Sequence, residues 1–190
     1  MRPAINTVQT VAGPVDAAEL GIVLPHEHLF NDLSTCLVAP NFGFSHVLPD
    51  RAVTPSLQWA LKQDPYCSRD NIAPKEFDSV AREATAFQEV GGGTIVDATG
   101  SAGIGRSPTD LVRLSQITGL HVVMSTAPYL EKFEGSRLAA DVDHLAEEIL
   151  HELSGGVGEE RIRAGMIGEV GVSPEFTEGE RTGLRAAALA

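Results

Sequence analysis

Apolar residues along this chain alternate between short continuous runs and longer stretches with helical spacing. Runs typical of buried parallel strands occur at 20–25, 94–99, 120–126 and 164–173. Between them, apolar side chains recur every three or four residues, as one face of a helix requires. The clearest helical stripes are Phe77, Val80, Ala81, Ala84, Phe87 and Val90, and then Val142, Leu145, Ile149 and Leu153. The pattern predicts successive strand–helix pairs.

The expected helix ends carry residues that commonly begin or stop helices. Ser107-Pro108-Thr109-Asp110 combines a capping hydroxyl, a proline at the first helical position and an acid, and Gly119 stops the helix that follows. Thr177-Glu178-Gly179-Glu180 resembles a capping box and opens an alanine-rich helix through Ala190. A fourth strand–helix pair is thereby completed.

The stretch from 30 to 73 has no sustained period and contains prolines at 40, 49, 55 and 65. Long loops in compact domains are usually functional, so we expect this one to lie over the site. A short helix is expected within it, around 56–62.

Four strand–helix pairs in succession indicate an α/β fold with a parallel sheet and right-handed crossovers. The two candidate architectures are a doubly wound open sheet and part of a (β/α)8 barrel. In both, sites lie at the carboxyl ends of the strands. The site is therefore expected at those ends.

Composition and charge limit the classes of binding partner that the chain is expected to have. The chain has 190 residues, 43% of them hydrophobic and 21% charged, as in one ordinary globular domain. Its net charge of −12 disfavours nucleic acid and anionic membranes as partners and leaves a small-molecule substrate. The N-terminal stretch has no secretory signal pattern, and Cys36 and Cys67 are too few for a disulfide framework, so we expect a cytoplasmic location.

His26 and His28 follow the first apolar run, two residues apart. Side chains at that spacing on a strand point to the same face, which presents two imidazoles to one metal ion. Glu169 is the lone carboxylate in the fourth apolar run, flanked by Gly168 and Gly171. A buried carboxylate needs a metal or a cation, so Glu169 is either a ligand or the partner of an arginine, most simply Arg106, Arg161 or Arg163.

Five short motifs follow one another along the chain: Pro25–Leu29, Asp70–Ile72, Gly91–Asp97, Gly103–Arg106 and Gly165–Gly171. In this order they resemble the phosphotriesterase family of the amidohydrolase superfamily. The resemblance covers nearly the whole chain. It implies the (β/α)8 barrel and a metal-dependent hydrolase with two divalent metal ions, most often zinc, with manganese or cobalt as alternatives.

The resemblance also implies roles for the three residues already singled out. His26 and His28 correspond to ligands of one metal, and Glu169 stands where many members carry a carboxylated lysine that bridges two metals. In such enzymes a metal-activated water attacks an ester, lactone or phosphotriester, and the resemblance does not select among these substrates.

A complete (β/α)8 barrel typically needs about 250 residues. Residues 1–190 are therefore expected to form its N-terminal half, a single truncated hydrolase domain of four parallel strands with flanking helices. The family's ligands on the fifth, sixth and eighth strands have no counterpart in it, so we expect weak or no activity from the chain alone.

Three further residues near the strand ends are candidates. Tyr129 follows the third strand and could contact substrate or pack under the next loop. Asp97 lies inside the second strand and could orient the histidines or bind backbone groups. Arg106 is expected to anchor a loop by pairing with an acid.

Two rival interpretations remain open. Gly100–Gly105 suggests a nucleotide-binding loop, but it has neither the dinucleotide glycine spacing nor the lysine and hydroxyl of a P-loop. A half barrel also leaves sheet edges exposed, which favours a non-catalytic assembly module or a homo-oligomer.

Overall fold

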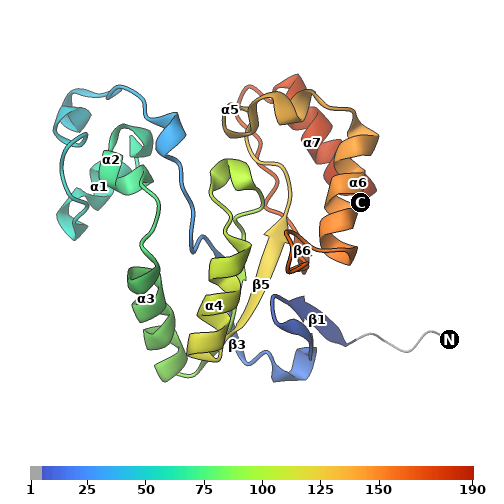
Figure 1. Cartoon of the computed structure of the whole chain (residues 1–190). Coiled ribbons are helices and arrows are strands. Elements are labelled where there is room, and N and C mark those ends of the chain that lie inside the picture. The colour runs from blue at the N-terminus through green and yellow to red at the C-terminus, as the bar shows by residue number, and fades with distance from the viewer. Residues whose placement is uncertain (1–5) are drawn as a thin grey trace.

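The computed structural model describes residues 6–190, in which four parallel strands form a curled sheet (Figure 1). The strands lie side by side in sequence order, each hydrogen-bonded to the next in parallel register. They are β3 (Ile22–Glu27), β4 (Gly92–Asp97), β5 (His121–Thr126) and β6 (Met166–Ile167). The prediction of an α/β fold with half of a parallel barrel is confirmed. Residues 1–5, part of the stretch interpreted above as lacking a secretory signal, lie outside the described residues.

A long helix follows each strand, as the apolar spacing predicts. These helices are α3 (Phe77–Glu89), α4 (Pro108–Thr118), α6 (Val142–Ser154) and α7 (Glu178–Leu189). In the chain, α3 packs against α4, and α6 packs against α7 (Figure 1). Three short helices lie in the connections: α1 (Gln58–Leu61), α2 (Arg69–Ile72) and α5 (Glu131–Glu134).

Gly119 and the Thr177–Glu180 capping box form as their residues predict, but the capping hydroxyl expected at the start of α4 does not. Ser107 donates its hydroxyl to the Asp110 carboxylate at 2.7 Å and makes no capping hydrogen bond to the first turn. Gly119 ends α4 in the left-handed conformation, at φ 72°. At the start of α7, the Thr177 hydroxyl accepts from the Glu180 N–H, while the Glu180 carboxylate accepts from the Thr177 N–H. This capping box satisfies two backbone donors that the first helical turn leaves without partners.

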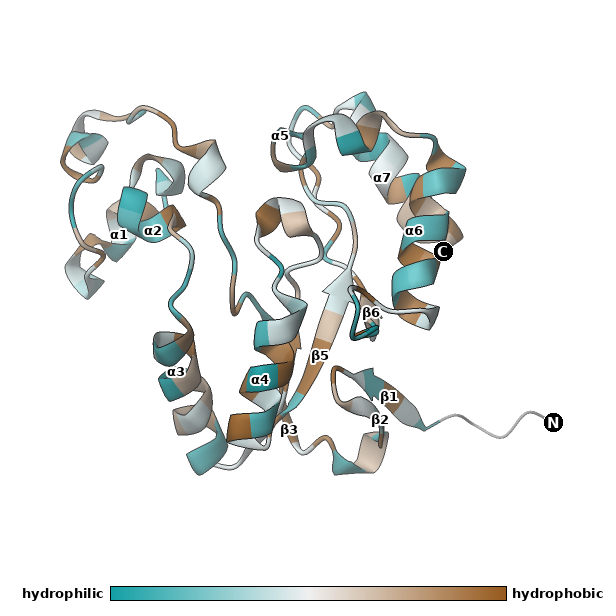
Figure 2. Cartoon of the chain, in the orientation of Figure 1, coloured by the Kyte–Doolittle hydropathy of each residue, from teal (hydrophilic) through white to brown (hydrophobic). Residues whose placement is uncertain are grey.

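The main hydrophobic core lies between the sheet and α3 and α4. Figure 2 shows hydrophobic residues along β5 and on α4, where the two elements meet. Leu111, Leu114, Val122 and Met124 are completely buried there. Burial of apolar surface stabilises a fold by about 25 cal/mol per Å². The packing of these side chains therefore holds the strands in one curved sheet.

The N-terminal residues form an antiparallel hairpin that the sequence pattern does not predict. It consists of β1 (Thr7–Thr10) and β2 (Gly13–Asp16). Val11, in its turn, is buried in the main core and donates its backbone N–H to the Val122 carbonyl at 2.8 Å. The strands are only four residues long, too short for a periodic signal.

The prediction of a strand over 164–173 is wrong in its extent. β6 covers only Met166–Ile167, and Glu169 lies beyond it rather than within a buried strand. Gly168 adopts φ 133°, a conformation that side-chain-bearing residues rarely adopt, and the chain leaves the sheet there. The Glu169 side chain is consequently 28% exposed.

Residues 30–73 are more ordered than a loop without secondary structure. They contain α1, α2 and several 3-10 turns, and Leu48, Ala60, Leu61 and Cys67 form a small core of their own. Asp64 joins two turns there by accepting from the Ser45 hydroxyl at 2.6 Å and from the Asn41 backbone N–H at 2.7 Å. The expected short helix near 56–62 is present as α1.

No helix in the described range has both the length and the apolar character to cross a lipid bilayer.

Glu180 joins the segment after β6 to the start of α7. It is 2% exposed, and its Oε2 accepts from the Ser173 backbone N–H at 2.9 Å, the Ser173 hydroxyl at 2.8 Å and the Thr177 N–H at 3.2 Å. Burial acts to raise the pKa of Glu180, but these hydrogen bonds outweigh it and lower the pKa below its ordinary value.

Glu180→Gln tests this contact. We expect the free energy of unfolding at pH 7 to fall by about 1–2 kcal/mol, because the amide loses the charge-assisted hydrogen bonds. Since the folded-state pKa is lowered, the stabilisation is present above the unfolded pKa, about 4.3, and is lost as the pH falls through the folded pKa. The free energies of unfolding of parent and variant in urea should therefore converge as the pH falls below the folded-state pKa of Glu180.

Glu178→Gln is the matched control, because Glu178 lies in the same helical turn with its side chain 80% exposed. We expect it to change stability by less than about 0.5 kcal/mol over the same pH range. Equal effects of the two substitutions at pH 7 would contradict the assigned role of Glu180.

Candidate metal centre

An irregularity in the pairing of β3 with β4, between Leu24 and Glu27, includes His26 and lies directly before His28. Leu24 pairs with Ile95 and Glu27 with Asp97, so three steps along β3 span two steps along β4. The extra residue is a bulge, which re-aims the side chains that follow. The His26 and His28 rings lie edge to face, with centroids 5.4 Å apart.

Glu169 reaches the same two rings from the other edge of the sheet. Its Oε2 lies 2.9 Å from His26 Nε2, and its Oε1 lies 3.4 Å from His28 Nε2. The curl of the sheet brings the ends of β3 and β6 together, although the residues are about 140 positions apart in the sequence. None of the three arginines considered as its partner pairs with Glu169. Arg106 binds Glu152, Arg161 donates to the Gly155 carbonyl, and Arg163 donates to Gln9.

The three side chains suit a divalent metal ion. One ligand atom from each lies within 4.8 Å of the others. Two imidazole nitrogens and a carboxylate oxygen are a common donor set for zinc. All three remain partly exposed, the His26 side chain most at 53%, which leaves a side open to water or substrate. Within residues 6–190, no other group of three such side chains meets the same distance limit.

Tyr129 lies in the connection after β5 and faces the cluster. Burial, together with the charge and a hydrogen bond of Glu169, raises its pKa to about 12. Its phenol is therefore neutral at physiological pH and available as a hydrogen-bond donor beside the carboxylate.

Asp97, the last residue of β4, is completely buried beneath the cluster. Its Oδ1 accepts from the Thr99 N–H at 3.1 Å and from the Leu29 N–H at 3.4 Å. Its Oδ2 has no hydrogen-bond partner among the described residues. Burial raises the pKa of Asp97.

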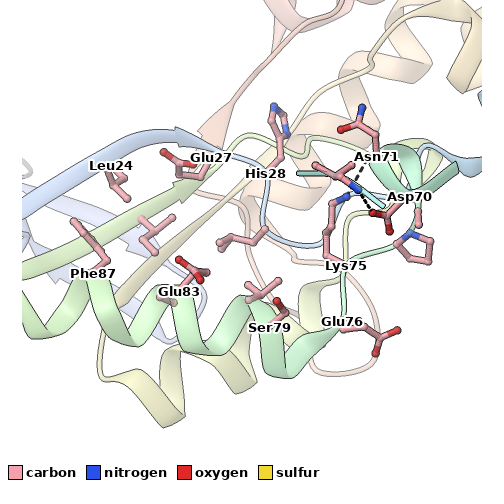
Figure 3. A pocket seen from close by; sticks show the side chains of 17 residues that line it. Leu24, Glu27, His28, Asp70, Asn71, Lys75, Glu76, Ser79, Glu83 and Phe87 are labelled. Carbon is pink, nitrogen blue, oxygen red and sulfur yellow. Dashed lines mark hydrogen bonds between the residues drawn. The ribbon is translucent and has the colours of Figure 1, made fainter. Parts of the chain in front are cut away.

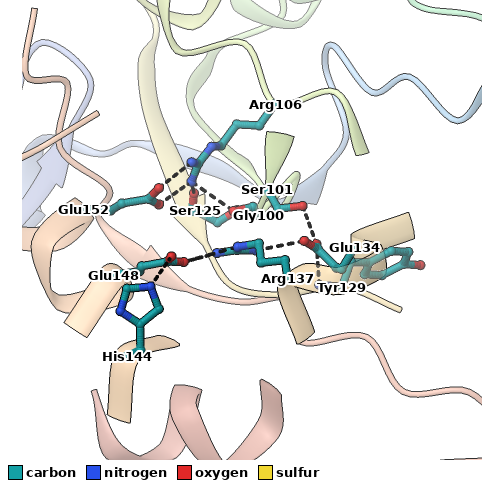
Figure 4. Close-up of polar contacts among 10 residues, drawn as sticks. All are labelled: Gly100, Ser101, Arg106, Ser125, Tyr129, Glu134, Arg137, His144, Glu148 and Glu152. Atoms are coloured by element: carbon teal, nitrogen blue, oxygen red, sulfur yellow. Dashed lines mark hydrogen bonds and ion pairs between the residues drawn. The ribbon is translucent and has the colours of Figure 1, made fainter. Parts of the chain in front are cut away.

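Arg106 ties strand ends together instead of approaching the histidines. Its guanidinium donates to both carboxylate oxygens of Glu152, at 2.6 and 2.7 Å, and to the carbonyls of Gly100 and Ser125 (Figure 4). The pair is nearly buried, with 6% of the Arg106 side chain exposed. Burial acts to raise the pKa of Glu152, but Arg106 outweighs it and lowers the pKa.

A second buried carboxylate, Glu134, positions Tyr129 and was not found from the sequence. It accepts from the Tyr129 backbone N–H at 2.8 Å and from the Ser101 hydroxyl at 2.5 Å, and it pairs with Arg137 at 2.9 Å (Figure 4). Arg137 also binds Glu148. The segment around Glu134 is rich in charged residues, so no sequence signal separates this carboxylate from a solvated one.

A cavity of about 550 Å³ lies beside β3 and α3, and His28 contributes to its wall. Figure 3 shows Glu27 and Phe87 along it, with Asp70 and Asn71 at one end. Val53 and several residues of the segment 70–76 therefore line the same cavity as His28. That the segment from 30 to 73 covers the metal cluster itself stays a prediction.

Comparison with known proteins finds similarity over nearly the whole chain. The family model described as "Phosphotriesterase family" matches residues 6–190. The N-acetyltaurine hydrolase of Tetraodon nigroviridis is 35% identical over 186 residues, which cover 96% of this chain and 52% of the relative. The chain spans about half the length of the curated relatives it matches.

Solved structures likewise match nearly the whole of this chain and about half of their own length. A resiniferatoxin-binding protein from Rhodobacter sphaeroides superposes with a TM-score of 0.86 at 38% identity, over 96% of this chain and 51% of that one. An enzyme engineered for organophosphate hydrolysis from a weak promiscuous lactonase template gives a TM-score of 0.68 at 28% identity, over 96% and 50%.

The Arg106–Glu152 pair makes a prediction about stability. Arg106→Met leaves the Glu152 carboxylate without its cation, so we expect the free energy of unfolding to fall by roughly 3–5 kcal/mol. Denaturant unfolding at pH 7 measures the change. Arg82→Met is the control, because Arg82 is exposed on α3 and should tolerate the substitution within about 0.5 kcal/mol. A similar small loss for Arg106→Met would contradict the anchoring role.

Proposed function

The chain belongs to the phosphotriesterase family, and we propose that it carries one part of a metal-dependent hydrolase site, with His26, His28 and Glu169 as metal ligands. The observation that carries the proposal is the approach of both histidine Nε2 atoms to the two oxygens of one carboxylate. An ordinary ion pair needs only one such contact. Two imidazoles around one carboxylate are typical of a metal site.

The proposed roles follow from the contacts. His26 and His28 would hold one divalent ion through their imidazoles, and Glu169 would be the shared carboxylate ligand of the two-ion centre that family membership implies. Zinc fits this donor set best, with manganese or cobalt as alternatives. A divalent metal in such a site acidifies a bound water and polarises the oxygen of the bond to be cleaved.

Tyr129, Glu134 and Arg106 have roles in the proposed site other than metal binding. The neutral phenol of Tyr129 donates a hydrogen bond to a substrate oxygen beside Glu169, and Glu134 holds the Tyr129 backbone for this purpose. Arg106 keeps the ends of β4 and β5 in register, so that the ligands from different strands stay converged.

The substrate class we propose is a carboxylic ester, lactone or amide, or a phosphotriester. The lactonase template and the N-acetyltaurine hydrolases support the carboxylic members, the latter extending the range from esters to amides. All share an electrophilic carbon or phosphorus whose oxygen a metal can polarise.

The metal ligands can be tested without turnover. We expect the parent chain to bind zinc in a calorimetric titration, and His26→Ala, His28→Ala and Glu169→Gln each to weaken binding at least tenfold. Glu27→Gln is the matched control, because Glu27 lies between the two histidines in sequence but outside the ligand group. Zinc binding that is absent from the parent, or equally weakened by Glu27→Gln, would contradict the assignment.

Activity is a separate prediction. Residues 6–190 offer three converging ligands, whereas a two-metal centre needs more, so we expect weak or no turnover of lactone, aryl ester or N-acyl amide substrates by this chain with zinc or manganese. Robust metal-dependent turnover would overturn that expectation. Thermal stabilisation by ATP or NAD but not by zinc would instead favour the nucleotide-binding interpretation.

A further inference from the structure

We propose that Thr99 is a positioning residue for the metal centre, which orients the His28 ring so that Nε2 faces the metal. The inference rests on the proposed function and concerns a residue outside the ligand set. Thr99 Oγ1 lies 3.1 Å from His28 Nδ1, the ring nitrogen on the side away from Glu169.

The two imidazoles differ in this respect. The His28 ring is held from both sides, by Thr99 at Nδ1 and by Glu169 at Nε2, and its side chain is 33% exposed. The His26 ring makes its polar contact with Glu169 alone among the described residues and is 53% exposed. Thr99 itself is completely buried, so bulk water does not compete with the ring for its hydroxyl.

The backbone around Thr99 is anchored to both halves of the site. Asp97 Oδ1 accepts the N–H groups of Thr99 and of Leu29, the residue after His28. The Ala98 N–H donates to the Glu27 carbonyl at 2.7 Å, and the Ala98 carbonyl accepts from the Glu169 N–H at 3.4 Å. Residues 97–99 therefore link the histidine pair on β3 to the carboxylate after β6.

A hydroxyl at this position can accept a hydrogen bond from the ring and so stabilise the tautomer that binds a metal through Nε2. When Thr99 Oγ1 accepts from the His28 Nδ1–H, the lone pair of the neutral imidazole is on Nε2, toward the ligand group. A hydrogen bond at the distal nitrogen also fixes the ring orientation, and its removal typically costs 10–100-fold in metal affinity. The side chain at 99 thus sets how tightly His28 contributes to the site.

Thr99→Val and Thr99→Ser test the inference in the full 190-residue chain. Valine matches the shape of threonine without the hydroxyl, so we expect zinc affinity to fall about 10–100-fold in a calorimetric titration. Serine retains the hydroxyl and should bind within about threefold of the parent. Thermal unfolding midpoints of the metal-free proteins should agree within a few degrees, since the hydroxyl acts on the ring and not on the core.

Nitrogen-15 spectra of the zinc-loaded parent add an independent measurement. We expect the His28 imidazole proton on Nδ1, with Nε2 shifted by the metal. Zinc affinity unchanged in Thr99→Val, or equal losses in the valine and serine variants, would each overturn the role of Thr99 while leaving the metal site intact. A proton on Nε2 would overturn both the role of Thr99 and the assignment of His28 Nε2 as a ligand atom. A parent chain that binds no zinc would overturn the proposed function and this inference together.

Discussion

The contact of one carboxylate with two imidazoles is the interaction on which the site depends. Glu169 meets both His26 and His28, although its strand and theirs are the first and last of the four-stranded sheet. A flat sheet would hold these strand ends about 14 Å apart, given roughly 4.8 Å between neighbouring strands. The curl of the sheet is therefore a functional requirement, and the packing of α3 and α4 on its outer side maintains it.

Buried polar groups hold the ends of β4 and β5, which lie between the two sides of this contact. Arg106 joins the segment after β4 and the end of β5 to α6, and Glu134 joins Ser101 to the Tyr129 backbone. Each is an ion pair or a charge-assisted hydrogen bond out of water, where losing one partner costs far more than at the surface. Residues that never touch a substrate thus determine where the ligands stand.

Family membership defines the type of chemistry more closely than the substrate. The relatives include N-acetyltaurine hydrolases and an enzyme derived from a lactonase, which act on different bonds. A metal-activated nucleophile is indifferent to much of the substrate beyond the oxygen that is polarised. In the proposed site, selectivity is assigned to the residues around the cluster, among them Tyr129, whose pKa is raised beside Glu169.

The sequence by itself determined the alternation of strands and helices, the end of α4 at Gly119, the capping box of α7, and the three candidate ligands, because periodicity, caps and His-x-His spacing are local signals. It did not determine the hairpin of β1 and β2, the early end of β6 at Gly168, or the contacts of Thr99 and Glu134. These depend on which distant segments the curled sheet brings together. Only the tertiary structure decided that Arg106 pairs with Glu152 and that Glu169 contacts the histidines. The sequence offers several arginines that could pair with either carboxylate, and only the fold brings one of them within reach.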